Sequence, residues 1–225
     1  MAVGPSQVRI LPPAPGDVTV KIIDIKKTLD AIAIAEAAAA IRAGGLVIYP
    51  TETVYGLGAD ACSDEAVTKV FSAKHRPQKN PIPIAVGSFE MARMIAESTP
   101  AAERLFAEFL PGPLMVVLPS KPKISKLVTA GTGKVGIRVP DHPVALRLID
   151  FVGGPITATS ANLSGKPPPR VVEDALEQVG RNVAFTLDAG KCKLGVPSTV
   201  VDLTSGRPKI LREGPISAEK IKKVL

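Results

Sequence analysis

Six short segments of the sequence place hydroxyl, amide or cationic side chains directly after apolar stretches that are typical of strands. They are residues 50–58, 74–81, 136–140, 157–165, 195–200 and 211–215. Serines and threonines supply hydrogen-bonding hydroxyls, and arginines and lysines supply cations that match phosphate or carboxylate oxygens. Gathered at the ends of strands, such groups have the chemistry of a water-poor site for a polyphosphate.

Arg138 is the residue for which a purely structural role is hardest to accept. It lies between Ile137 and Val139 in an apolar run, where a cation has to be paired or face an anion. Lys74 and Arg76 lie at the expected C-terminal end of a helix, where cations also stabilise the helix dipole, so both a structural and a functional role remain open for them. Taken singly, Thr51 and Thr53 are better explained as caps of a turn, and Ser160 and Asn162 can be turn formers at the start of a helix.

Two glycine patterns have the spacing of dinucleotide-binding motifs but lack the surrounding structure. Residues 56–61 read GxGxxA, yet residues 74–76 are basic where an acidic partner for ribose is expected. Residues 131–136 read GxGxxG but run into a predicted strand, and no P-loop sequence is present. His75 and His142 are the only histidines, and neither is placed for a nucleophilic triad. No pair of acidic residues is spaced for a two-metal site.

Composition limits the class of protein. The chain has 225 residues, two cysteines and a net charge of +7, which attracts anions such as nucleotides and RNA. Cys62 and Cys192 are far apart in sequence, which suits the reducing cytoplasm, and no apolar run reaches the roughly 18 residues of a membrane span. An aromatic content of 4% disfavours a single-strand binder that stacks many bases. We therefore expect a cytoplasmic protein that is neither secreted nor in the membrane.

The pattern of apolar residues predicts an α/β fold with a twisted, mixed parallel and antiparallel sheet and flanking helices. We expect strands at 18–25, 46–49, 82–86, 114–118, 135–139, 156–158, 183–187, 199–203 and 210–211, and helices at 29–42, 63–73, 89–97, 101–109, 144–151, 172–179 and from 217. Residues 1–17 are rich in proline and are expected to be a disordered tail. With no second linker, residues 18–225 are expected to form one domain.

At the same polar segments the sequence closely resembles the YrdC-like family, the L-threonylcarbamoyladenylate synthases. The matches are PTETVYGLG at 50–58, KHR at 74–76, PGP at 111–113, IRVP at 137–140, SAN at 160–162, PST at 197–199 and LREG at 211–214. Each match alone is weak, but the ordered set is specific and covers about residues 20–225. The resemblance implies the single-domain form of the family, with its mixed α/β sheet around a large basic cavity.

The activity that the resemblance implies is a nucleotidyltransferase reaction. L-threonine, bicarbonate and ATP would give L-threonylcarbamoyl-AMP and pyrophosphate, as the first step of tRNA N6-threonylcarbamoyladenosine formation. A downstream tRNA threonylcarbamoyl-transferase system would then use the product. Mg²⁺ would arrive with ATP, and neither a resident metal nor a permanently bound cofactor is expected.

The resemblance also implies a role for each matching residue. Threonine would be bound by Thr53, Arg138, Ser198 and the backbone near Ala158. ATP would be surrounded by Arg76, Asn80, Lys134, Ser160, Asn162 and Arg212, and Lys74 and Arg76 would be catalytic. Some relatives carry a histidine that contacts threonine where Ala85 stands in this chain, so this contact is not expected here.

Two other functions remain to be weighed. A non-catalytic module for double-stranded RNA or tRNA would recognise shape and phosphates, and it predicts steeply salt-dependent binding without ATP turnover. The gathering of polar residues at strand ends disfavours it, because a groove binder spreads lysine and arginine over one face. Carbamoyl transfer in hydrogenase maturation also uses a YrdC-like domain, but in a larger protein with acylphosphatase and zinc-finger regions that a chain with two cysteines does not provide.

Overall fold

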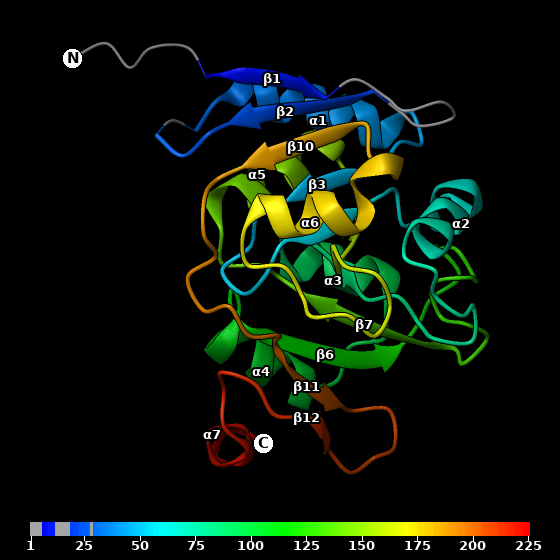
Figure 1. Cartoon of the computed structure of the whole chain (residues 1–225). Helices are drawn as coiled ribbons and strands as arrows, with labels where there is room; N and C mark the ends of the chain where they lie inside the picture. The colour runs from blue at the N-terminus through cyan, green and yellow to red at the C-terminus, as the bar shows by residue number, and fades with distance from the viewer. Residues whose placement is uncertain (1–5, 12–18, 28) are drawn as a thin grey trace.

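The computed structural model describes residues 6–11, 19–27 and 29–225, and these form two mixed six-stranded sheets with flanking helices (Figure 1). Sheet A contains, in spatial order, β1 (Val8–Leu11), β2 (Val20–Asp24), β10 (Phe185–Asp188), β3 (Val47–Tyr49), β4 (Gly56–Gly58) and β9 (Thr159–Ser160). Sheet B contains β12 (Lys209–Arg212), β11 (Thr199–Asp202), β6 (Leu114–Pro119), β7 (Lys134–Arg138), β5 (Ile84–Ala85) and β8 (Ile156–Thr157). The predicted α/β class with a mixed sheet is confirmed, with the strands divided between two sheets.

Helices cover both faces of sheet A. Figure 1 shows α1 (Ala31–Arg42) and α5 (Pro143–Val152) behind it and α6 (Val172–Val179) in front. The remaining helices are α2 (Asp64–Ala73), α3 (Phe89–Ile95), α4 (Pro100–Phe109) and α7 (Ala218–Val224), together with a 3₁₀ turn at Gly180–Asn182. All seven predicted helices are present, and five of them, α1 to α4 and α7, begin directly after a residue whose side chain caps the first turn. The first begins at residue 31 rather than 29 because the Asp30 carboxylate accepts the Ile32 and Ala33 amides at 3.0 Å.

Two clusters of buried apolar side chains hold these layers together. Strand β3 is buried on both sides: Val47 and Tyr49 face the cluster formed with α1 and α5. Ile48 faces the larger cluster, which joins the other face of sheet A to Ile137 and other residues of sheet B. This alternation is the period of two that a strand imposes, and it buries both faces of β3.

Three strands were not predicted by the sequence pattern. Strand β1 pairs antiparallel with β2, from Val8↔Ile23 to Leu11↔Val20, within the segment expected to be a disordered tail. That expectation is wrong for residues 8–11, because pairing with β2 supplies the backbone hydrogen bonds that the local sequence does not predict. Residues 1–5 and 12–18 lie outside the described residues. The other two strands, β4 and β9, are short polar or glycine-containing segments that pair with each other.

One end of sheet B collects several of the predicted site residues. Strand β7 ends at Arg138, β11 begins at Thr199 directly after Ser198, and β12 ends at Arg212. Strand β6 is antiparallel to β7 and parallel to β11, and β12 is antiparallel to β11. These directions place Arg138, Ser198 and Arg212 at the same end of the sheet.

The matching end of sheet A supplies the other residues. The loop 50–55 joins β3 to β4, and Ser160 of β9 pairs with Gly56 beside that loop. The chain passes from sheet B to sheet A at Ala158, between β8 and β9. The two sheets therefore meet at the position where the sequence segments rich in hydroxyl groups converge.

Gly56 is required by a close approach between β3 and β4. A Cβ atom at this position would lie 2.7 Å from Cζ of Tyr49, whose hydroxyl donates to the Thr157 carbonyl at 3.1 Å. We expect Gly56→Ala to lower the free energy of unfolding by about 1–3 kcal/mol, because the ring has no room to move aside. Urea unfolding measures this, with Gly154→Ala as the control, since a Cβ there meets nothing within 4 Å. An equal loss in both variants would contradict the steric argument.

Candidate functional site

Arg138 is paired inside the protein, as the sequence requires of a buried cation. One terminal nitrogen donates to Thr53 Oγ1 at 2.9 Å, and the other forms an ion pair with Glu52. The side chains of Arg138 and Glu52 are 7% and 6% exposed. Arg138 Nε and Glu52 Oε2 are buried and have no hydrogen-bond partner among the described residues. The ion pair therefore leaves one hydrogen-bond donor and one acceptor without a partner among the described residues.

The loop that carries Glu52 and Thr53 is held by its own hydroxyls and by a neighbouring loop. Thr51 Oγ1 donates to the Val54 carbonyl at 2.7 Å. The Leu194 and Gly195 amides donate to the carbonyls of Glu52 and Thr53, both at 2.8 Å. These bonds fix the Arg138 partners to the segment that leads to Ser198.

Ser198 and Arg212 complete the end of sheet B. Arg212 Nε donates to the Ser198 carbonyl at 2.9 Å. The Ser198 side chain is buried, and its Oγ has no hydrogen-bond partner among the described residues. Partial burial, followed by the charge of Arg138, lowers the pKa of Arg212. Two guanidinium groups that act on each other in this way favour an anion beside them.

Lys74 is buried and holds the SAN turn. Its ammonium group donates to the carbonyls of Ser160 and Asn162. Its own carbonyl accepts the Ser164 amide at 2.9 Å. Asn162 Nδ2 donates to two carbonyls of the same turn, whereas Asn162 Oδ1 is buried and without a partner among the residues described. Lys74 therefore fixes the turn that presents Ser160 and Asn162.

Burial away from water, followed by the charge of Arg76, lowers the pKa of Lys74 to about 7. The neutral amine keeps two N–H donors, which match its two carbonyl acceptors. Between about pH 7 and the ordinary lysine pKa of 10.5, the unfolded chain therefore binds the proton that the folded protein has lost. The free energy of unfolding rises with pH across this window because of this residue.

We expect this rise to disappear in Lys74→Met. Between pH 7 and 9 the wild type should gain stability relative to the variant by up to about 1 kcal/mol per pH unit. Urea unfolding of both proteins at several pH values measures the difference, in which the groups common to both cancel. A difference that does not change with pH would contradict the lowered pKa.

Arg76 lies just beyond α2, half-buried and turned back onto its own loop. Its Nε donates to the Asn80 carbonyl at 3.2 Å, and one terminal nitrogen donates to the Pro81 carbonyl at 2.8 Å. Burial lowers the pKa of Arg76. These contacts hold the guanidinium in one orientation and keep Asn80 beside it.

A cavity of about 20 Å³ lies where the two sheets meet. Its walls include Thr51, Ala85, Arg138 and Ser160, so residues from four separate segments come together there. The volume is close to that of one water molecule, much less than the large cavity implied by the resemblance. Threonine fits only if it lies across the mouth of this cavity or if the surrounding loops move apart.

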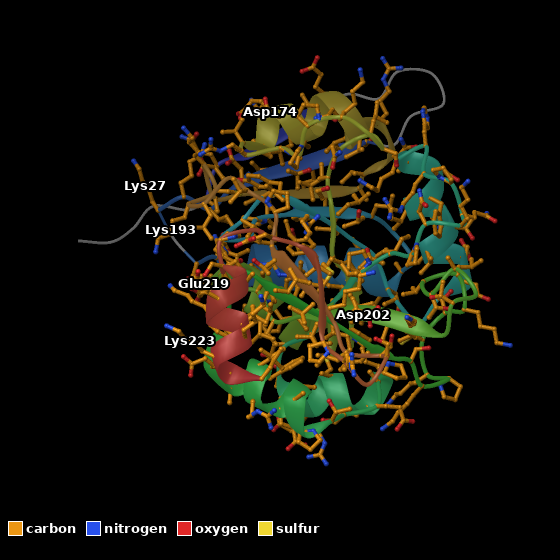
Figure 2. All side chains as sticks on the ribbon, turned by 90° about the horizontal axis from the view of Figure 1, so that it is seen from below. Lys27, Asp174, Lys193, Asp202, Glu219 and Lys223 are labelled. Carbon is orange, nitrogen blue, oxygen red and sulfur yellow. The ribbon has the colours of Figure 1, made fainter. Side chains whose placement is uncertain are left out.

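A larger hollow of about 720 Å³ lies between β12 and α7, with Arg212 on its wall. Glu219 and Lys223 of α7 point outward, away from this hollow (Figure 2). Its wall is formed by residues 208–213 and by the C-terminal helix, and it includes none of the predicted threonine-binding residues. Two of the predicted threonine-binding residues, Arg138 and Ala158, line the small cavity instead.

The structure does not bring Lys134 close to Arg138 and the other predicted site residues. Lys134 begins β7 and Arg138 ends it, so their Cα atoms are about 13 Å apart at a strand rise of about 3.3 Å per residue. The Lys134 ammonium is 3.3 Å from the Asp202 carboxylate at the far end of sheet B.

The residue that the sequence analysis missed is Glu52, an acid directly beside Thr53 in a segment already singled out for its polar groups.

The chain matches known proteins both in sequence and in fold. The model of the Sua5/YciO/YrdC family, described as telomere recombination, matches residues 39–214. The chain belongs to this family. A family member from Pyrococcus abyssi, named threonylcarbamoyl-AMP synthase, is 42% identical over 91% of this chain and 60% of its own length. A member of the same name from Bacillus subtilis is 43% identical over 85% of this chain and 56% of its own length.

Solved structures of the Sua5/YciO/YrdC family have the same fold. Pyrococcus abyssi Sua5 complexed with L-threonine superposes with a TM-score of 0.88 at 42% identity, over 91% of this chain and 60% of that one. Escherichia coli YciO has a TM-score of 0.81 at 22% identity, over 91% of this chain and 99% of that one, which supports the fold alone. The chain thus spans about 60% of the Pyrococcus relative and shares its fold throughout the matched part. Within the described residues, no helix has the length and apolar character needed to cross a membrane.

Proposed function

We propose that this protein makes L-threonylcarbamoyl-AMP from L-threonine, bicarbonate and ATP and releases pyrophosphate. The observation that carries the proposal is the buried group of Arg138, Thr53 and Ser198, with unpartnered donors and acceptors, in a chain 42% identical to a Sua5 that was solved with L-threonine. The names of the relatives from Pyrococcus abyssi and Bacillus subtilis support the same activity.

The contacts support a role for each group. Arg138 binds the threonine carboxylate, and the hydroxyls of Thr53 and Ser198 bind its polar groups. Arg76 and Arg212 bind the phosphates of ATP, since both are cations held in place by backbone carbonyls. Ser160 and Asn162 contact the nucleotide from the turn that Lys74 fixes. The contacts of Lys74 support a positioning role for it rather than the catalytic role that the resemblance implies.

The reaction needs no nucleophile from the protein. The threonine amine attacks carbon dioxide derived from bicarbonate and loses a proton, which gives a carbamate. A carbamate oxygen then attacks the α-phosphorus of ATP, and the bond to the bridging oxygen of the β-phosphate breaks, so that pyrophosphate leaves. The protein acts by holding the reactants together and by stabilising negative charge on the phosphate oxygens. Mg²⁺ enters as part of the ATP substrate.

The test measures pyrophosphate release by the purified protein, with threonine and bicarbonate each left out in turn. Release that requires both substrates supports carbamate-dependent adenylation. Release from ATP that needs neither of them, or no release at all, would contradict the proposal. Steeply salt-dependent binding of double-stranded RNA without ATP turnover would instead favour the binding module.

We place the reaction in the cytoplasm, in line with the two free cysteines, and expect a tRNA threonylcarbamoyl-transferase system to use the product.

A further inference from the structure

Glu52 has no role in the proposed reaction, yet it lies buried against the residue assigned to the threonine carboxylate. One carboxylate oxygen pairs with Arg138, and the other, Oε2, has no partner among the described residues. A buried carboxylate oxygen without a partner costs free energy unless something that binds there compensates it. The same holds for Arg138 Nε, so the two side chains of the ion pair leave one acceptor and one donor unused.

The charge of the pair limits what can bind to it. Glu52 and Arg138 together are neutral, and their side chains are 6% and 7% exposed. A simple anion at Arg138 would compete with Glu52 for the guanidinium and bring negative charge close to the Glu52 carboxylate. A ligand that brings one negative and one positive group close together satisfies both unused atoms and adds no net charge. An α-amino acid is such a ligand, since its ammonium and carboxylate groups are on adjacent atoms.

We propose that Glu52 binds the α-ammonium group of the amino-acid substrate through Oε2, while Arg138 Nε binds its carboxylate. This inference rests on the proposed function, because it takes threonine as the substrate of this site. Glu52 then selects an α-amino acid over a hydroxy acid, and it aims the nitrogen that becomes the carbamate. The ammonium charge disappears when the carbamate forms, so the interaction acts on threonine binding more than on the later adenylation.

The first experiment uses the unaltered protein. Isothermal titration calorimetry compares L-threonine with 3-hydroxybutanoate, which has the carboxylate and the β-hydroxyl but lacks the ammonium group. We expect 3-hydroxybutanoate to bind at least about 10-fold more weakly, as loss of a hydrogen bond to a buried charged group implies. Equal affinity for the two ligands would overturn the inference.

The second experiment compares Glu52→Gln with Glu65→Gln, an exposed carboxylate on α2 that serves as the matched control. Glutamine keeps an acceptor for Arg138 but removes the charge that faces the ammonium group. In the Glu52 variant we expect threonine to bind about 10- to 100-fold more weakly, while binding of 3-hydroxybutanoate changes less than about threefold. The KM for threonine should rise by a similar factor, with a much smaller change in kcat. Glu65→Gln should leave the affinity for both ligands unchanged.

The outcomes distinguish failure of the inference from failure of the proposed function. Equal weakening of both ligands in Glu52→Gln would mean that Glu52 only orients Arg138, and the inference would be wrong. If the variant does not fold, the ligand comparison on the unaltered protein still decides the question. An unaltered protein that neither binds threonine nor releases pyrophosphate would overturn both the inference and the proposed function. Threonine-dependent pyrophosphate release together with indifference to Glu52 would overturn the inference alone.

Discussion

Replacing Arg76 by alanine is expected to lower threonine-dependent pyrophosphate release about 30- to 1,000-fold. The guanidinium is held by the Asn80 and Pro81 carbonyls, so it is already oriented before any phosphate arrives. Loss of one preorganised donor at a site of developing charge costs about 2–4 kcal/mol of transition-state stabilisation. Initial rates of pyrophosphate release at saturating threonine and bicarbonate measure the effect, with ATP varied.

Two further variants show whether the loss reflects phosphate binding. Arg93→Ala, which removes an exposed arginine that lies over Phe89 on α3, should leave the rate unchanged. Arg76→Lys keeps the charge but loses the planar fork, so it should recover little activity. Calorimetry should show that Arg76→Ala binds threonine with an affinity close to that of the unaltered protein. Near-normal release by Arg76→Ala would remove the residue from the proposed phosphate site.

Replacing Arg138 by methionine is expected to have the largest effect on stability. The change leaves the Glu52 carboxylate buried without its cation, and breaking a buried ion pair in this way costs about 3–5 kcal/mol. Urea unfolding of Arg138→Met against the unaltered protein measures the loss. Threonine binding should be lost in the same variant. Arg138 is the proposed partner of the threonine carboxylate, and it also holds the Thr53 hydroxyl in place.

A double variant separates the charge from the packing. Glu52→Gln combined with Arg138→Met removes both charges, so a large part of the lost stability should return, although threonine binding should not. Arg147→Met is the control, since Arg147 is an exposed residue whose nitrogen is 3.6 Å from Asp150. That change should alter the free energy of unfolding by less than about 0.5 kcal/mol. Similar stability of Arg138→Met and Arg147→Met would show that the buried pair contributes nothing.

Much of the fold could be predicted because helix and strand periods are local properties of the sequence. Helix α2 follows from the Ser63 cap and its apolar spacing, and α1 from a run of alanine and isoleucine that stops at Gly44. Strands β4 and β9 could not be predicted, since they are two or three residues long and exist through the pairing of Gly56 with Ser160. The division into two sheets depends on long-range pairing, which no local pattern specifies.

The candidate site was predictable in kind but not in arrangement. Arg138 in an apolar strand requires a partner, yet its partner Glu52 is 86 residues away and only the fold brings them together. Lys134 is four residues from Arg138 in the sequence, and strand geometry places it at the opposite end of the sheet. Lys74 was predicted as a cation at a helix end, whereas its burial follows from the turn that packs over it.

The position of β10 in sheet A has a consequence for how the protein is made. This strand, residues 185–188, lies between β2 and β3 and is parallel to both, although they precede it by more than 130 residues. A chain emerging from the ribosome therefore exposes the apolar edges of β2 and β3 until β10 has been synthesised. Ser198 and Arg212 follow later still. The site is completed only once residue 212 has been made, and until β10 is available those edges are open to pairing with other chains.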